Sequence, residues 1–331
     1  MASLREIKDR IGSVRSTLKI TSAMKLVASA KLRKAQKAIE GMRPYENALT
    51  DILVAVQYGG ISPEPPAALK SLSDFAVGKV PGPGRSADAD FVTPAHAAGA
   101  PHGKTAIVAV SSNSSLCGGF NANVVRKALE TIRSCGGEVE VFPVGRKMTE
   151  ALRRAGYTAD RDLNDLIGHP SYEKSATLAR ELARRFEEGE FSRVVLVYNH
   201  FVSTSSQVPV EEQFLPLANG SGAAKSASAD NRPAPGVLPE GKYAEGGMLP
   251  YILEPDAQAL AAQLLPQVQM LKFHAAILDS AAAEQAARTI AMQTATDNAE
   301  DLLGELTLEY NKGRQQKITA EILDLLGGAA E

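Results

Sequence analysis

Several features are scarce in this chain of 331 residues, and each absence excludes a class of protein. The two cysteines, Cys117 and Cys135, are too few for a disulfide-stapled scaffold, so we expect reduced, structural thiols. The five histidines are scattered and share no metal-ligand spacing with the cysteines. We therefore expect neither a metal ion nor a cofactor.

Long apolar runs are missing too. No stretch approaches the ~20 consecutive apolar residues that a membrane-spanning helix needs. The N-terminus opens directly into an amphipathic pattern without the apolar block of a signal peptide, so we expect no signal or transit peptide and a cytoplasmic location. With 44% hydrophobic residues and a net charge of −2, the chain still has material for a sizeable core.

A coiled-coil repeat fills the N-terminal segment 3–57. Side chains recur there at alternating spacings of three and four residues, the pattern of a coiled-coil seam rather than of a globular helix face. Only Thr21 and Lys25 interrupt its apolar character. The seam consists of Leu4, Ile7, Ile11, Val14, Leu18, Thr21, Lys25, Ala28, Leu32, Ala35, Ile39 and Met42.

A matching repeat fills the segment 256–327. Its seam consists of Leu264, Val268, Leu271, Ala275, Leu278, Ala282, Gln285, Thr289, Met292, Thr296, Ala299, Leu303, Leu306 and Tyr310. Beyond Tyr310 the stripe changes phase to Ile318, Ile322 and Leu325, a stutter that locally relaxes a supercoil. Helices of these lengths extend about 80 and about 105 Å. We expect a rod with a globular body attached.

The charges of the two segments favour antiparallel pairing. Residues 1–43 hold eleven basic and three acidic side chains, a net charge of +8. Residues 256–331 hold five basic and eleven acidic side chains, a net charge of −6. Exposed ion pairs contribute only about 0.2–1 kcal/mol each, so the seam must supply most of the stability.

Composition divides the remainder of the chain. Two segments rich in Gly, Ala, Ser and Pro are expected to be flexible inserts, and strand and helix patterns alternate between them. The expected strands are 105–111, 138–143, 193–203 and 207–216, the last two as a hairpin-like pair, and the expected helices are 121–134, 146–155 and 171–188. The predicted division is a coiled-coil helix at 1–58, an insert at 59–103, an α/β domain at 104–217, an insert at 218–250 and a coiled-coil helix at 251–331.

Residues 99–105 resemble a phosphate-binding loop. The motif requires glycine at the position held by Ala98, and Gly99 comes one residue too late. The context is also wrong, because a phosphate loop opens a helix whereas Lys104 and Thr105 open an expected strand. We do not expect phosphate binding here.

Cys117 lies at an expected strand-to-helix turn, where a nucleophile could be displayed. A catalytic cysteine needs a nearby base and an electropositive setting, and no histidine is close in sequence. A tight turn permitted by Gly118 and Gly119, with a packed thiol, is the better interpretation. We expect no catalytic residue in this chain.

The basic N-terminal helix raises the question of nucleic-acid binding. It contains no aromatic residue before Tyr45, and its charges surround an apolar seam that another helix must cover. The pattern favours a solvated coiled-coil flank, and we expect no nucleic-acid partner.

A second apolar stripe, formed by Ile20, Met24 and Val27, lies off the seam of the first helix. A two-stranded coil cannot bury both faces, and the chain offers no third long helix to cover this one. The stripe therefore indicates additional protein around the coil.

At these residues the chain resembles the gamma subunit of F-type ATP synthases. Residues 7–35, around Ile-Thr-Ser-Ala-Met-Lys-Leu-Val-Ala-Ser-Ala-Lys-Leu, are similar to one hallmark of that family, and residues 291–299 and 310–321 to a second. Residues 116–121, 197–199 and 207–209 resemble it as well. The similarity covers nearly everything except the two inserts.

The resemblance implies a fold and a function. The fold is a long antiparallel two-helix coiled coil with an inserted Rossmann-like α/β domain. The coil is a shaft inside a ring of three alpha and three beta subunits, and the domain lies against the membrane c-ring and the epsilon subunit. The implied role is the rotary central stalk that couples proton flow to ATP synthesis, peripheral on the cytoplasmic face of the bacterial inner membrane, with no catalytic group of its own.

The resemblance also implies contact residues. Met24 and Lys25 match positions that face the beta subunits, and Arg314, Gln315 and Thr319 match polar contacts to their catch loop. The apolar C-terminal residues match a bearing at the top of the ring: Ile318, Ile322, Leu325 and Leu326.

One departure from the family pattern concerns the turn before Leu116. Asn113, Ser114 and Ser115 stand where Asp-Arg-Gly is usual, which puts the charged contact of that turn in doubt. The inserts are longer than in compact members and lack the paired cysteines of the redox-regulated chloroplast form, which argues against thiol control.

Two other interpretations account for the long helices. A coiled-coil scaffold or chaperone-like interaction protein explains them but does not require the second stripe. An α/β enzyme with helical arms lacks an acid/base or phosphate-binding constellation.

Overall fold

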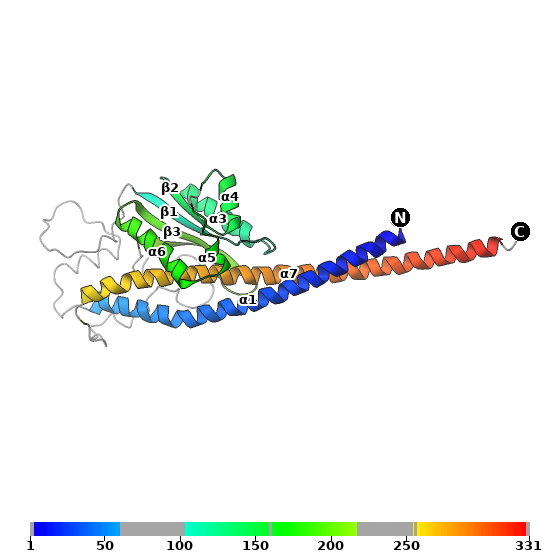
Figure 1. Cartoon of the computed structure of the whole chain (residues 1–331), viewed down its shortest axis with the longest axis horizontal. Helices are drawn as coiled ribbons and strands as arrows, with labels where there is room; N and C mark the ends of the chain where they lie inside the picture. The colour runs from blue at the N-terminus through cyan, green and yellow to red at the C-terminus, as the bar shows by residue number, and fades with distance from the viewer. Residues whose placement is uncertain (1–2, 60–102, 159–160, 217–253, 255–256, 329–331) are drawn as a thin grey trace.

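The fold is a long helical rod with an α/β body on one side (Figure 1). The computed structural model describes residues 3–59, 103–158, 161–216, 254 and 257–328. Helix α1 spans Leu4–Gly59 and α7 spans Ala257–Gly328, close to the bounds predicted from the heptads. The inserts expected at 59–103 and 218–250 fall almost wholly outside the described residues.

The two long helices pair in antiparallel fashion, as the charges predicted. At one end, Leu4 lies against Gly313, where an added Cβ would approach the leucine Cδ2 to 3.0 Å. At the other end, Leu49 and Leu53 pack with Val268 in one apolar cluster. Every seam residue predicted on either helix up to Tyr310 is buried or half-buried, so the interface follows the predicted heptad stripe.

The body is a four-stranded sheet of order β2-β1-β3-β4. Strands β1 (Lys104–Val110), β2 (Val139–Val144) and β3 (Phe191–Phe201) are mutually parallel, and β4 (Gln207–Leu215) is antiparallel to β3, as the predicted hairpin requires. The helices are α3 (Phe120–Ser134), α4 (Arg146–Arg154), α5 (Asp165–Gly168) and α6 (Tyr172–Glu187). Helix α5 was not predicted from the sequence, because four residues are too few for a periodic signal.

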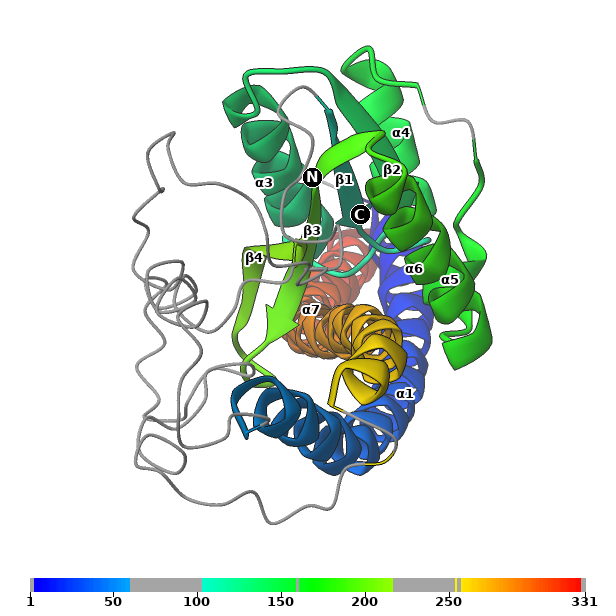
Figure 2. The same ribbon diagram turned by 90° about the vertical axis from the view of Figure 1, so that its left-hand side faces the viewer.

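The two faces of the sheet pack on different helices (Figure 2). Along β1, the alternation of a strand sends Ile107 and Ala109 toward the core shared with α3 and α4. Ala106, Val108 and Val110 point to the opposite core, which contains residues of α6. That second core also includes side chains of the shaft helix α7: Phe273, Ala276 and Ile277.

Helix α7 is therefore a component of both parts of the molecule. One of its faces covers the sheet, while another carries the seam against α1. Small side chains make this double packing possible, because Ala282 and Ala286 contact the α1 side and Ala283 and Ala287 contact the body. Burial on two sides joins the body to the rod.

Candidate partner-binding surface

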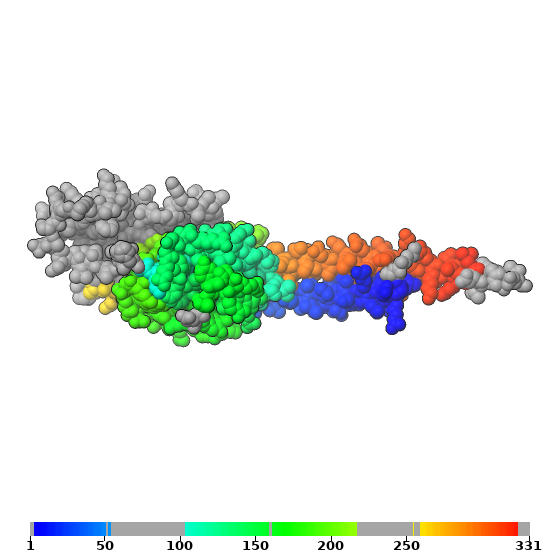
Figure 3. Space-filling view, turned by 90° about the horizontal axis from the view of Figure 1, so that it is seen from above, coloured from blue at the N-terminus to red at the C-terminus, as the bar shows by residue number. Residues whose placement is uncertain are grey.

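The tip of the rod is the part of α7 that runs past the start of α1 (Figures 1 and 3). Among the described residues, nothing of α1 lies opposite α7 beyond Gly313. The phase change predicted after Tyr310 coincides with this point, because a stripe without a partner helix need not keep the seam register. Five predicted contact residues are exposed on the tip: Arg314, Gln315, Ile318, Thr319 and Ile322.

The tip combines polar and apolar exposed groups. Ile318 and Ile322 are 46% and 51% exposed at a spacing of four residues, and Leu323 beside them is also exposed. The Thr319 hydroxyl donates to the carbonyl of Gln315 at 2.9 Å, so it is turned back onto the helix. The predicted residues Leu325 and Leu326 lie on the last turns of α7, and their side chains are outside the described ones.

A second band lies further down the coil, on α1. Ile20 and Val27 are exposed, as the second stripe predicted, and Met24 between them is half-buried. Lys25 is half-buried at its seam position. Leu26 is 68% exposed as well. The sequence did not indicate this, because Leu26 lies on neither apolar stripe. Exposed apolar groups gathered in this way mark a surface that another molecule covers.

The structure does not bring the two bands together. Thr21, next to the lower band, lies level with Thr296, since their hydroxyl oxygens are 3.1 Å apart. Arg314 comes eighteen residues after Thr296 on the same helix, which corresponds to about 27 Å along the axis. The predicted site residues therefore form a collar near Met24 and a separate tip, and no single pocket contains both.

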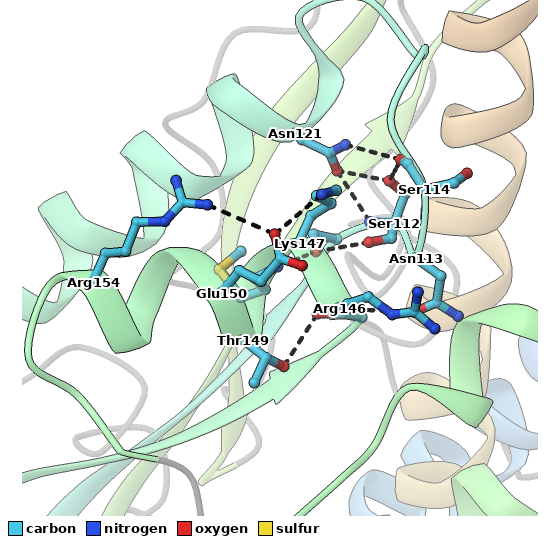
Figure 4. A network of polar contacts seen from close by, with 12 residues as sticks. Ser112, Asn113, Ser114, Asn121, Arg146, Lys147, Thr149, Glu150 and Arg154 are labelled. Carbon is cyan, nitrogen blue, oxygen red and sulfur yellow. Dashed lines mark hydrogen bonds and ion pairs between the residues drawn. The ribbon is translucent and has the colours of Figure 1, made fainter.

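The turn after β1 settles the question raised by Asn113 (Figure 4). Its Oδ1 accepts the backbone N–H of Arg146 at 3.0 Å, and its Nδ2 donates to the carbonyl of Asn164 at 2.8 Å. Ser112 donates its backbone N–H to Asn121 Oδ1 at 3.1 Å. Asn113 thus holds the turn against α4 and the segment before α5, an internal role that needs no charge.

A buried ion pair joins this turn to the shaft. Arg288 of α7 donates to Glu284 at 2.8 Å and to the hydroxyl of Ser114 at 2.8 Å. Burial raises the pKa of Glu284, while Arg288 and Lys31 act in the opposite direction. The i,i+4 spacing of the pair was visible in the sequence, but its contact with Ser114 joins residues 174 positions apart.

Lys104 and Cys117, from the two segments considered for chemistry, have structural roles. Residues 99–102 lie outside the described residues, but Lys104 opens strand β1 and pairs with Glu138 at 2.8 Å, whereas the lysine of a phosphate loop opens a helix. Cys117 is buried against Phe120 and Ala283, and burial raises the pKa of its thiol. Gly118, at φ +57°, supplies the left-handed backbone that the turn needs.

Membrane spans and metal clusters were sought in the described part of the chain. None of its helices is apolar over enough length to cross a bilayer. Its His, Cys, Asp and Glu side chains form no group of three or more that could hold a metal ion.

Comparison with known proteins assigns the family. The family model described as ATP synthase matches residues 3–330. The ATP synthase gamma chain of Phocaeicola vulgatus is 42% identical over 334 residues, covering 99% of each chain, and that of Bacteroides thetaiotaomicron is 41% identical over 335 residues, covering 100% of each. A structure of the central stalk and c-ring of the Tetrahymena thermophila mitochondrial ATP synthase matches with a TM-score of 0.48 at 20% identity, covering 83% of this chain and 99% of that one. On its full-length match to the family model and to these relatives, the chain belongs to the family of ATP synthase gamma chains.

Proposed function

We propose that this chain is the central rotor shaft of an F-type ATP synthase. Its coil stands inside a ring of three alpha and three beta subunits, and it carries no catalytic group. The observation that supports this role best is the exposed apolar surface of the shaft, at Ile20 and Val27 in the collar and at Ile318 and Ile322 on the tip. A partner that surrounds the rod is the simplest way to cover apolar groups that are exposed on both of its helices.

The two bands divide the contact with the ring. Met24 and Lys25 of the collar face the beta subunits, near the exposed Leu26. On the tip, the polar residues contact the catch loop of a beta subunit, and the apolar residues turn in the bearing at the top of the ring. The polar set is Arg314, Gln315 and Thr319, and the apolar set is Ile318, Ile322, Leu325 and Leu326.

Coupling follows from the asymmetry of the shaft. A coil of two unlike helices presents a different side to each of three beta subunits at any moment. Contacts that stabilise one conformation of a nucleotide site more than another shift the affinity of that site. Rotation then takes every site through the same series of states, and proton flow through the membrane rotor is thereby coupled to ATP synthesis.

The body is the part that receives the torque. We place it against the c-ring and the epsilon subunit, with the complex peripheral on the cytoplasmic face of the bacterial inner membrane. Phe273 and Ile277 of α7 are buried in the core of the body, so a force on the sheet acts directly on the shaft helix. The ion pair of Glu284 and Arg288 adds a polar contact between α7 and the body, because Arg288 also donates to Ser114.

Co-purification tests the assignment. The tagged full chain, expressed with its own alpha and beta subunits, should be recovered with three copies of each. Binding to only one kind of subunit, or recovery of the chain alone, would contradict the proposal. Stoichiometry by native mass spectrometry is the direct readout.

Met24→Lys tests the collar. A lysine placed beside Lys25 adds a second cation where the shaft meets the beta subunits, so we expect weaker coupling between ATP hydrolysis and proton pumping. The fold should be unaffected, because the side chain is only half-buried. Ala38→Lys is the matched control, since it adds the same charge at an exposed position of α1 outside both bands. Normal pumping per ATP hydrolysed in the Met24 variant would refute the contact.

A further inference from the structure

Polar side chains from four elements meet where the body contacts the rod. The sheet contributes side chains from β3 and β4, and the rod contributes side chains from α1 and α7. The cluster consists of Glu46, Tyr198, His200, Glu212, Lys272 and Asp279, with Arg43 near it. Nothing in the proposed rotor mechanism uses these groups.

His200 and Asp279 link the end of β3 directly to α7. Nδ1 of His200 lies 2.5 Å from Oδ2 of Asp279. The other carboxylate oxygen, Oδ1, accepts the backbone N–H of Phe201 at 3.3 Å. One aspartate on the shaft therefore holds both a side chain and a backbone group at the end of β3.

A second group of contacts in the cluster centres on Glu212. Lys272 pairs with Glu212 at 2.9 Å, and the hydroxyl of Tyr198 donates to the same carboxylate at 2.9 Å. Burial raises the pKa of Glu46, and the charge of Glu212 adds to that effect. Glu212 thus has two partners of its own within the cluster, Lys272 and Tyr198.

A proton on His200 balances the cluster. Three carboxylates, those of Glu46, Glu212 and Asp279, face two permanent cations, those of Lys272 and Arg43. With all three carboxylates ionised, the formal charges cancel when the imidazole is charged, and one negative charge is left over at a partly buried interface when it is neutral. Unbalanced charge is costly there because the low dielectric of protein strengthens repulsion.

We propose that His200 and Asp279 form a proton-dependent clasp that fastens the end of β3 to the shaft. The clasp is closed when His200 is protonated, because the hydrogen bond then joins two opposite charges. It loosens when the imidazole loses its proton. The opening is local, since the apolar core around Phe273 and Ile277 keeps the rest of the sheet on α7.

The direction of the pH dependence follows from the contacts of His200. The hydrogen bond to Asp279 raises its pKa above the ordinary value of 6.5, while burial and Arg43 act in the opposite direction and Glu212 adds to the rise. A group whose pKa is raised by folding contributes its full stabilisation below its unfolded-state pKa. That stabilisation is lost as the pH rises through the folded-state value, so the clasp weakens under alkaline conditions.

Hydrogen exchange at Phe201 tests the clasp in the full chain. The amide of Phe201 is bonded to Asp279, so its protection, resolved to single residues and corrected for intrinsic exchange, reports clasp opening. Between about pH 6 and about pH 9, protection should fall by up to about tenfold for each unit by which the clasp raises the pKa of His200. His200→Lys should abolish the fall, because its charge persists through this range.

Three further variants complete the test. His200→Gln should keep protection at Phe201 at the low level of the alkaline wild type, independent of pH, and Asp279→Asn should bring the NMR titration of His200 back toward 6.5. His169→Gln, a change at an exposed histidine after α5, should behave as the wild type. Protection that is independent of pH in the wild type, or an equal fall in the His200→Lys variant, would overturn the proposal. Titration of His200 at or below 6.5 would do so even if a variant failed to fold.

Discussion

The stretch of α7 beside the body and the tip of α7 belong to one continuous helix, but the first is buried and the second is exposed. Beside the body, Ile277 is 1% exposed and packs into the core of the sheet, while neighbouring positions pack on α1. At the tip, Ile322 is 51% exposed. Between them, Thr296 is buried and lies against Thr21 of α1. The same heptad-like pattern therefore serves internal packing in one stretch of α7 and leaves a surface for a partner in another.

The difference arises from length rather than from hydrophobicity. Helix α1 has 56 residues and α7 has 72, and α7 extends beyond the start of α1 at the tip. Both stretches contain apolar side chains. They are buried only where α1 and the sheet of the body pack against α7. Substitutions along α7 should therefore have effects on stability that decrease from the body to the tip.

The largest effect on stability is expected from Ile277→Ala. The side chain is fully buried between α7 and the sheet, and removing it leaves a cavity that the surrounding core cannot close. The free energy of unfolding should fall by roughly 2–5 kcal/mol, as for other large-to-small changes in cores. Urea denaturation of the full chain measures the loss. A change below about 1 kcal/mol would show that the body and the shaft are joined less tightly than the structure indicates.

The middle stretch should respond in a different way, because its contact is polar. Thr21 and Thr296 form a buried hydroxyl pair across the seam. Each hydroxyl also donates to a carbonyl of its own helix, Thr21 to Leu18 at 3.1 Å and Thr296 to Met292 at 2.8 Å. Replacing either one by valine therefore deprives the other hydroxyl only of their mutual contact and should cost about 1 kcal/mol or less, while replacing both should cost less than the two single changes together. A double-mutant cycle by urea denaturation measures the coupling. Simple additivity would mean that the contact between the two hydroxyls adds nothing to the bonds within each helix.

The amino-acid sequence predicts the rod better than its attachment to the body. The seams were predictable because the heptad is a local, repeated signal, and the strands because each is a short alternating or apolar run. The contact of Phe273 and Ile277 with the sheet was not, since these residues lie off the seam and nothing local says what covers them. The clasp joins His200 to Asp279, 79 positions away, which no sequence pattern specifies.

For the partner-binding surface, exposure was predictable but arrangement was not. The second stripe correctly indicated that Ile20 and Val27 lie outside the seam. The distance between the collar and the tip depends on the register of the two helices, which the pairing of Thr21 with Thr296 fixes only in the folded chain. An apolar stripe can show which side of one helix is exposed. The register of the two helices decides which exposed residues of α1 and α7 lie at the same height along the rod.

The smallest effect on stability is expected from Ile322→Ala, which makes the same chemical change as Ile277→Ala at the other end of the helix. Half of the Ile322 side chain is already exposed in the free chain, so its removal should change the free energy of unfolding by less than about 0.5 kcal/mol. The affinity of the Ile322→Ala variant for the ring of alpha and beta subunits should fall nonetheless, because the Ile322 side chain is buried by the ring in the proposed complex. Urea denaturation and a binding titration on one preparation separate the two effects. Equal losses of stability in the two alanine variants would mean that the tip is packed within the chain itself, and the contrast between the two ends of α7 would disappear.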